Sequence, residues 1–303
     1  MQEKRFTVIS DYDGLEIQCL LYEPEQSPKG IVQLVHGMCE HKDRYTAFMR
    51  FLAEKGYVVE CHDHRGHGDS VKDKEDFGWF GDYDGVAVVE DVAKITRYLK
   101  SEYPNLPLTL FGHSMGSLIV RCYLREHDEE IDKLIVCGSP SKNPLVGIAI
   151  GLEKTIRLFR GNRHRSKTLF YLSTGKGDKK FPGEGRCCWL TRDAEVSKGY
   201  LSDPKCGYIF TCNGFENLFK LMKRTYQKKG YAVKNPDLPV YFVAGGDDPV
   251  IGNELKWFQT IEFLRGVGYT QVSGKLYENM RHEILNEIGK EEVYADLLSF
   301  MES

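Results

Sequence analysis

A serine between two glycines is the clearest chemical signal in the sequence. Residues 112–116 are Gly-His-Ser-Met-Gly, preceded by the apolar run Leu108–Phe111 and followed by the helix-like stretch Leu118–Arg125. A nucleophile elbow requires this order of strand, sharp turn and helix, because the turn lifts the serine hydroxyl clear of the sheet. Glycines on both sides of the serine remove side chains that would clash in such a turn. The pattern therefore predicts Ser114 as a nucleophile, and its flanks argue against an ordinary turn serine.

A serine nucleophile needs a base, and the base needs an acid that holds it in place. In the architecture that carries such elbows, the three follow one another as serine, acid and histidine. The apolar run Val240–Ala244 leads into a loop with two candidate acids, Asp247 and Asp248. A proline directly after Asp248 fixes the loop there and favours this residue, which leaves Asp247 as a turn residue. His282 is the only histidine after position 164, so it is the predicted base.

Ester or amide hydrolysis also requires amides that stabilise an oxyanion. One donor in this architecture is the amide after the nucleophile, here Met115. The second comes from the loop after the third strand, residues 36–41, where Gly37 allows a close backbone turn. The second predicted donor is therefore the amide of Met38, and His36 in the same loop is interpreted as a hydrogen-bonded structural residue.

The histidine-rich segment 63–70, Asp-His-Arg-Gly-His-Gly-Asp-Ser, raises the alternative of a metal site. No further cluster of Cys and His completes such a site, and the predicted hydrolysis already has its nucleophile. We therefore predict neither a metal nor a cofactor. The segment is interpreted as a polar loop whose Arg and Asp side chains bond to each other and to nearby turns.

The elements around these residues indicate a mostly parallel sheet. Residues 6–9 and 15–21, with turn residues between them, predict an initial hairpin. Wholly apolar runs then alternate with stretches of helical spacing, such as Val88, Val92, Ile95 and Leu99. Buried runs of this kind are typical of parallel strands covered by helices on both faces.

The alternation stops after Pro140 and resumes near Leu238. We therefore predict an α/β core formed by residues 1–140 and 231–303, with a cap inserted at 141–230. Part of the cap, residues 142–186, is strongly basic, and this is either a solvated loop or a surface that attracts anionic lipid or substrate. Its Lys and Arg residues are at positions 142, 154, 157, 160, 163, 165, 167, 176, 179, 180 and 186.

Composition excludes several classes of protein. The chain has 303 residues and a formal net charge of −3, which gives no support for a nucleic-acid partner. Apolar runs are too short for a membrane span, and the first residues lack the apolar region of a cleaved signal peptide. The nine cysteines are scattered, and Cys19, Cys61 and Cys137 fall in strand-like runs. This usage predicts reduced core cysteines and a cytoplasmic protein.

Several motifs together resemble the α/β-hydrolase superfamily, and within it the monoacylglycerol lipase and lysophospholipase group, often named serine aminopeptidase S33-like. They are, in chain order, HGMCEHKDRY, DHRGHGDS, GHSMG, GGDDPV and NMRHEILNE. The resemblance implies an α/β-hydrolase fold with a mostly parallel eight-stranded sheet, helices on both faces and an inserted cap. It also places the nucleophile at Ser114, the acid at Asp248, the base at His282, and the oxyanion amides at Met38 and Met115.

This resemblance implies a serine esterase without a cofactor that acts on monoacylglycerols, lysophospholipids or similar small-molecule or lipid esters. Peripheral contact of the basic cap with a membrane or micelle is part of the same hypothesis. The alternatives are an aminopeptidase or an acyltransferase of the same fold, or a binding protein of that fold without catalysis. A serine at position 114 excludes dehalogenase and epoxide hydrolase chemistry, which would place an aspartate there.

Overall fold

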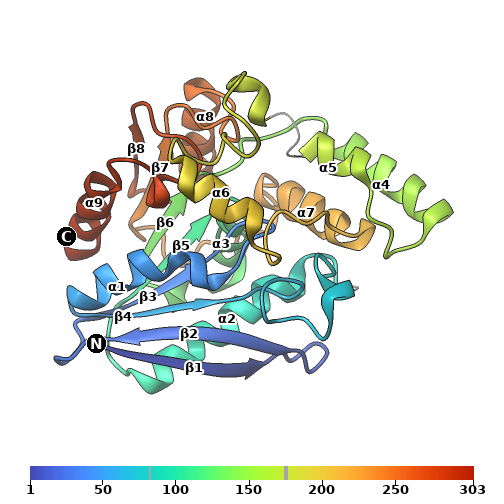
Figure 1. Ribbon diagram of the computed structural model, residues 1–303. Coiled ribbons are helices and arrows are strands. Elements are labelled where there is room, and N and C mark those ends of the chain that lie inside the picture. The colour runs from blue at the N-terminus through green and yellow to red at the C-terminus, as the bar shows by residue number, and fades with distance from the viewer. Residues whose placement is uncertain (82, 174–176) are drawn as a thin grey trace.

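The computed structural model of the chain describes residues 1–81, 83–173 and 177–303. Lys176, one of the basic residues counted above, lies outside these ranges. Within them the strands form one eight-stranded sheet in the order β1-β2-β4-β3-β5-β6-β7-β8 (Figure 1). The strands are β1 Gln2–Ile9, β2 Glu16–Glu23, β3 Gly30–Val35, β4 Tyr57–His62, β5 Leu108–His113, β6 Lys133–Cys137, β7 Val240–Gly245 and β8 Val272–Tyr277.

The sheet is antiparallel at one edge and parallel elsewhere. The predicted hairpin is confirmed as β1 and β2, and β2 also runs antiparallel to β4. From β4 through β3 to β8 every neighbouring pair is parallel. Because parallel strands end at the same edge, the loops after β3, β5, β7 and β8 meet there. These loops carry the residues for which the sequence predicts chemistry.

Helices cover both faces of the sheet, as predicted. The apolar sides of α1 (Thr46–Glu54) and α9 (Lys290–Glu302) pack into one hydrophobic core. The second core, on the other face, includes α2 (Val86–Glu102), α3 (Met115–His127) and α8 (Glu254–Arg265). The apolar stripe predicted from Val88 to Leu99 is buried along α2. The prediction of an α/β-hydrolase fold is confirmed.

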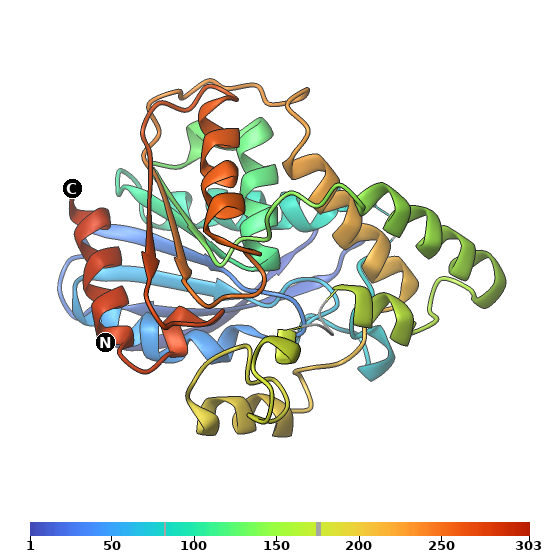
Figure 2. The ribbon, with the colours of Figure 1, turned by 90° about the horizontal axis from the view of Figure 1, so that it is seen from above.

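Between β6 and β7 the described chain forms helices that extend beyond the sheet. These are α4 (Val146–Arg160), α5 (Lys167–Ser173), α6 (Ala194–Ser202) and α7 (Cys212–Thr225). Helix α4 packs on α7 and lies at the outer edge of the molecule in both views (Figures 1 and 2). The boundaries 141 and 230 of a separate cap stay a prediction.

The predicted placement of three cysteines in the core is confirmed, since Cys19, Cys61 and Cys137 are buried in β2, β4 and β6. All nine cysteines of the chain are free thiols. In the described ranges each helix is too short or too polar to cross a lipid bilayer.

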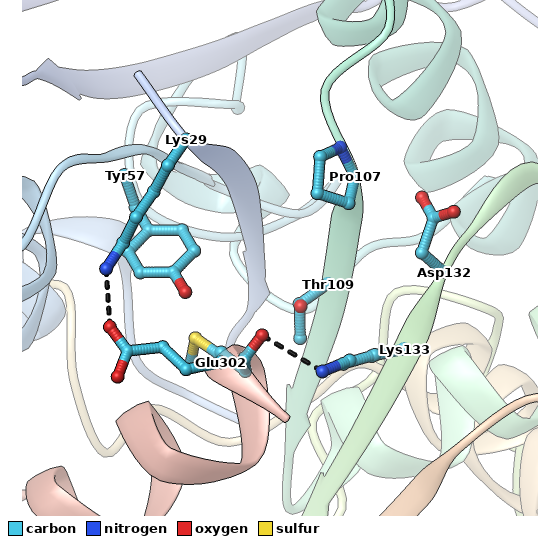
Figure 3. A pocket seen from close by; sticks show the side chains of 8 residues that line it. Lys29, Tyr57, Pro107, Thr109, Asp132, Lys133 and Glu302 are labelled. Carbon is cyan, nitrogen blue, oxygen red and sulfur yellow. Dashed lines mark hydrogen bonds and ion pairs between the residues drawn. The ribbon is translucent and has the colours of Figure 1, made fainter. Parts of the chain in front are cut away.

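A cavity of about 250 Å³ opens at the edge of the sheet away from the converging loops. It lies at the amino-terminal ends of β3 to β6 and beside the end of α9 (Figure 3). Its two lysines already have partners: Lys29 pairs with Glu302, and Lys133 donates to the carbonyl oxygens of Phe300 and Met301. Both lysines of this cavity are therefore held by contacts within the fold.

Candidate active site

The turn between β5 and α3 has the strained geometry of a nucleophile elbow. Ser114 has φ 54° and ψ −115°, a backbone conformation that residues with a side chain rarely adopt. A Cβ added to Gly116 would lie 2.0 Å from the carbonyl oxygen of Val35, and one added to Gly112 would lie 2.5 Å from the Gly116 oxygen. Only glycine fits at either position, so the local sequence dictates this turn. The half-buried Ser114 side chain therefore stands at the carboxyl edge of the sheet.

The predicted acid and base meet directly. His282 Nδ1 lies 2.8 Å from Asp248 Oδ2, and both side chains are almost fully buried. The other oxygen of Asp248 accepts the amide hydrogen of Val250 at 2.7 Å, which fixes the carboxylate. A carboxylate at Nδ1 holds the proton on that nitrogen and leaves Nε2 as the basic atom.

Asp247, the other candidate acid, is turned away from the histidine. Its side chain is 46% exposed and lies 3.6 Å from Lys180 Nζ, and its carbonyl oxygen accepts a hydrogen bond from the same amine. Of these two aspartates, only Asp248 therefore contacts His282.

The histidine and the serine are brought together through their neighbours. The ring of His282 is centred 4.7 Å from the ring of His113, which directly precedes Ser114. A Cβ on Gly138, just after β6, would lie 3.2 Å from His282 Cε1, while the Ser114 amide donates to Cys137 in the same strand. Among the hydrogen bonds of the described residues, none joins Ser114 Oγ to His282. Such bonds often tighten only when substrate is bound.

The two predicted oxyanion donors flank the serine. Met115 is the first residue of α3, so its amide is one of those that have no acceptor inside the helix. Gly37, which precedes Met38, lies against the nucleophile: an added Cβ there would be 3.1 Å from Ser114 Cβ. The Gly37 amide itself donates to Glu40 at 2.6 Å. The loop after β3 therefore approaches Ser114 closely enough to contribute an amide.

Residues from the segment between β6 and β7 contact the predicted base, His282, and the sequence pattern missed them. The Trp189 ring is centred 5.0 Å from that of His282. The amides of His282 and Glu283 donate to the carbonyl oxygens of Trp189 (3.4 Å) and Leu190 (2.7 Å). A single tryptophan in a Gly- and Lys-rich stretch is too weak a signal to place it beside a residue 93 positions later.

A protein-family model described as serine aminopeptidase, S33, matches residues 26–289. This range covers most of the chain and contains every residue of the candidate site. The chain belongs to the serine aminopeptidase S33 family. The resemblance to this group of α/β-hydrolases is thereby confirmed.

Three known proteins illustrate what this S33-family chain is similar to. A protein of Mycolicibacterium smegmatis named monoacylglycerol lipase is 26% identical over 296 residues, which cover 96% of this chain and 94% of that protein. The monoglyceride lipase of Homo sapiens is 36% identical over 110 residues, only 35% of this chain and 34% of the relative. A thermostable carboxyl esterase from Bacillus coagulans, solved with glycerol, is 26% identical and superimposes with a TM-score of 0.91 over 100% of this chain and 98% of its own.

At the level of the family, these comparisons confirm the prediction of a carboxylic ester hydrolase. They favour an ester hydrolase of the α/β-hydrolase fold over the other functions considered from the sequence.

The histidine-rich loop of this S33-family hydrolase packs behind the site. The structural role predicted for His36 is confirmed, because it is buried and accepts the amide hydrogen of His64 at 3.1 Å. The prediction that Arg65 pairs with an aspartate of its own loop is wrong. It bonds instead to Asp91 at 2.8 Å and to Asp13 at 3.1 Å. Asp13 lies in the turn between β1 and β2, so the predicted bond from this loop to a turn is observed. Asp91 lies in α2, which the local pattern could not indicate.

Proposed function

We propose that this S33-family hydrolase cleaves carboxylic esters of lipid-like substrates, monoacylglycerols or lysophospholipids, through an acyl-enzyme on Ser114. The proposal is carried by the hydrogen bond between Asp248 and His282 beside the nucleophile elbow. The names of its relatives, monoacylglycerol lipase and carboxyl esterase, support this class of substrate.

In the proposed mechanism, Nε2 of His282 takes the proton of the Ser114 hydroxyl as the oxygen attacks the ester carbonyl. The amides of Met38 and Met115 stabilise the resulting oxyanion, each by roughly 3 kcal/mol. His282 then gives the proton to the leaving alcohol, and the acyl group stays on Ser114. Water, activated by the same histidine, releases the acid. Asp248 stabilises the imidazolium formed in both halves of the reaction.

The first test combines an active-site probe with a substrate panel. A fluorophosphonate is expected to add once, at Ser114, and mass spectrometry of the digested protein locates the adduct. Monoacylglycerols and lysophospholipids of several chain lengths are expected to be hydrolysed faster than an aminoacyl anilide. Faster turnover of the anilide would instead support an aminopeptidase, and an adduct elsewhere would overturn the assignment of Ser114.

We propose that residues 141–230 act as a cap over the site. The described helices of this segment are inserted between β6 and β7, and Trp189 lies beside His282. The amide of Gly207 donates to the carbonyl oxygen of Cys39 at 3.0 Å, in the loop that carries Met38. The inserted segment therefore contacts both sides of the proposed reaction centre.

We propose that α4 and the residue before it bring this hydrolase to a lipid surface. Leu145, Ile148, Leu158 and Phe159 are 60–80% exposed. Exposed apolar groups of this size next to cations are typical of surfaces that contact lipids. The expected cytoplasmic location is part of the same proposal and would give access to anionic leaflets.

The basic stretch contributes fewer free charges than the sequence suggested. Arg157 forms ion pairs with Glu153 and Glu216, and Arg163 pairs with Asp76 at 2.7 Å. Lys154 and Arg160 are exposed on α4, and no hydrogen bond or ion pair of the described residues involves their side chains. On this helix, these two cations are therefore available to an anionic surface.

Two variants separate the apolar and the ionic contributions to lipid binding. The double change Leu158→Ser with Phe159→Ser is expected to weaken vesicle binding about tenfold or more, whatever the headgroup charge. Lys154→Glu with Arg160→Glu should weaken binding to anionic vesicles more than to neutral ones. Cosedimentation with vesicles measures both, and Leu255→Ser on α8, 65% exposed, is the matched control. Equal binding by all variants would leave the basic stretch as a solvated surface.

A further inference from the structure

The buried carboxylate of Glu40 accepts several hydrogen bonds from the loop beside Ser114. Glu40 Oε1 accepts from the Gly37 amide at 2.6 Å and from the Tyr45 hydroxyl at 2.9 Å, and it lies 3.3 Å from His113 Nδ1. Its Oε2 accepts from Arg44 at 2.6 Å. A charge with so many buried donors is fixed in place, so Glu40 holds the residue that precedes the proposed oxyanion amide.

The same network extends to the base. Arg44 also bonds to both carboxylate oxygens of Glu283, at 2.7 and 2.6 Å. Glu283 directly follows His282 in the chain. The planar guanidinium therefore links the loop of the oxyanion amide to the loop of the base through two fixed carboxylates.

His113, the residue before Ser114, contacts both Glu40 and the backbone of His282. Its Nε2 lies 3.2 Å from the carbonyl oxygen of His282, an atom that only accepts hydrogen bonds. Its Nδ1 faces Glu40 Oε1 and lies 3.0 Å from the hydroxyl of Tyr45, which itself donates to Glu40. Nε2 needs a proton to donate to this carbonyl, and a second proton on Nδ1 lets the ring donate to Glu40 as well.

The environment of His113 favours this charged form. Burial alone lowers the pKa of the ring, but the hydrogen bond and the charge of Glu40 outweigh burial and raise the pKa of His113 above its ordinary value. The titratable and charged groups that face the ring from the elements around it are Glu40, Arg44, Tyr45, Cys137, His282 and Glu283.

We propose that Glu40 and the doubly protonated His113 are positioning residues of the hydrolase, which together hold the Met38 loop and the backbone of His282 in register with Ser114. Neither side chain touches the reacting atoms. Since His113 loses one of its two protons as pH rises, one of the two hydrogen bonds that it donates is lost at alkaline pH. Turnover per active site should therefore fall above a pH set by His113, and this inference rests on the proposed function.

Two variants of the full-length chain test the pair. Glu40→Gln removes the charge that keeps His113 protonated, so the alkaline fall in activity is expected at lower pH. The kcat per active site, counted with the fluorophosphonate, should drop about 10- to 100-fold with KM changed less than about threefold. His113→Gln still offers a donor for the His282 carbonyl but cannot titrate, so the alkaline fall at that pH should disappear.

Glu216→Gln is the matched control, because Glu216 is another buried, ion-paired carboxylate, away from the site. This variant should leave the pH profile unchanged even if it lowers stability. An alkaline fall that stays at the same pH in both test variants would overturn the inference, as would a loss confined to the number of active sites. Absence of ester turnover in the wild-type protein would count against the proposed function instead.

Discussion

Replacing Ser114 by alanine is expected to lower ester turnover by about 10⁴-fold or more, the largest effect of any single change in this chain. In the proposed mechanism the substitution removes the oxygen that forms the acyl-enzyme, while the proposed oxyanion amides stay. The backbone strain at φ 54° is borne by alanine as by serine, since both carry a Cβ. Little change in stability is therefore expected with this large loss of activity.

The measurement compares steady-state hydrolysis of a monoacylglycerol by the variant and the wild-type protein, together with labelling by the fluorophosphonate. Ser101→Ala is the control, because this serine is exposed near the end of α2. Full activity of the Ser114→Ala protein would show that another group is the nucleophile. A thermal melt near that of the wild-type protein excludes unfolding as the cause of the loss.

Replacing Asp248 by asparagine is expected to lower kcat by about 10³- to 10⁴-fold. The amide keeps the size of the carboxylate, but its nitrogen donates a hydrogen bond where the oxygen accepted one. His282 would then carry its proton on Nε2, the atom that receives the proton of Ser114 in the proposed mechanism. The imidazolium would also lose the negative charge 2.8 Å away that stabilises it.

The adjacent residue provides the control for this second prediction. Asp247→Asn removes only an exposed ion pair with Lys180, worth at most about 1 kcal/mol, and should leave kcat within about twofold of the wild-type value. Stopped assays of both variants at one pH give the comparison. If Asp247→Asn lost the activity and Asp248→Asn kept it, the acid would have been assigned to the wrong carboxylate.

Much of the fold could be predicted because its signals are local. Parallel strands such as β3 and β4 are short, mostly apolar runs buried on both faces, and α2 shows its apolar stripe at helical spacing. The elbow was also predictable, since Gly112 and Gly116 are required by close backbone contacts. In these cases the residue type itself carries the structural information.

Other features depend on partners that the local sequence does not contain. The short helix α5 and the nearby α6 lie in a stretch whose glycines and lysines give no clear apolar period. The choice between Asp247 and Asp248 depends on which side chain faces a histidine 34 residues further on. The partners of Arg65 come from the first loop and from α2, and no spacing rule joins them.

Two backbone hydrogen bonds connect distant parts of the chain. The amides of His282 and Glu283 donate to the carbonyl oxygens of Trp189 and Leu190, so movement of one pair of residues affects the other. If residues 189–190 swung outward, both amides would lose their acceptors and the imidazole would lose the indole beside it. Outward movement of residues 189–190 would thus remove contacts that hold His282, the proposed base, in place. In the proposed mechanism, substrate and product are therefore expected to enter and leave without displacing these two residues.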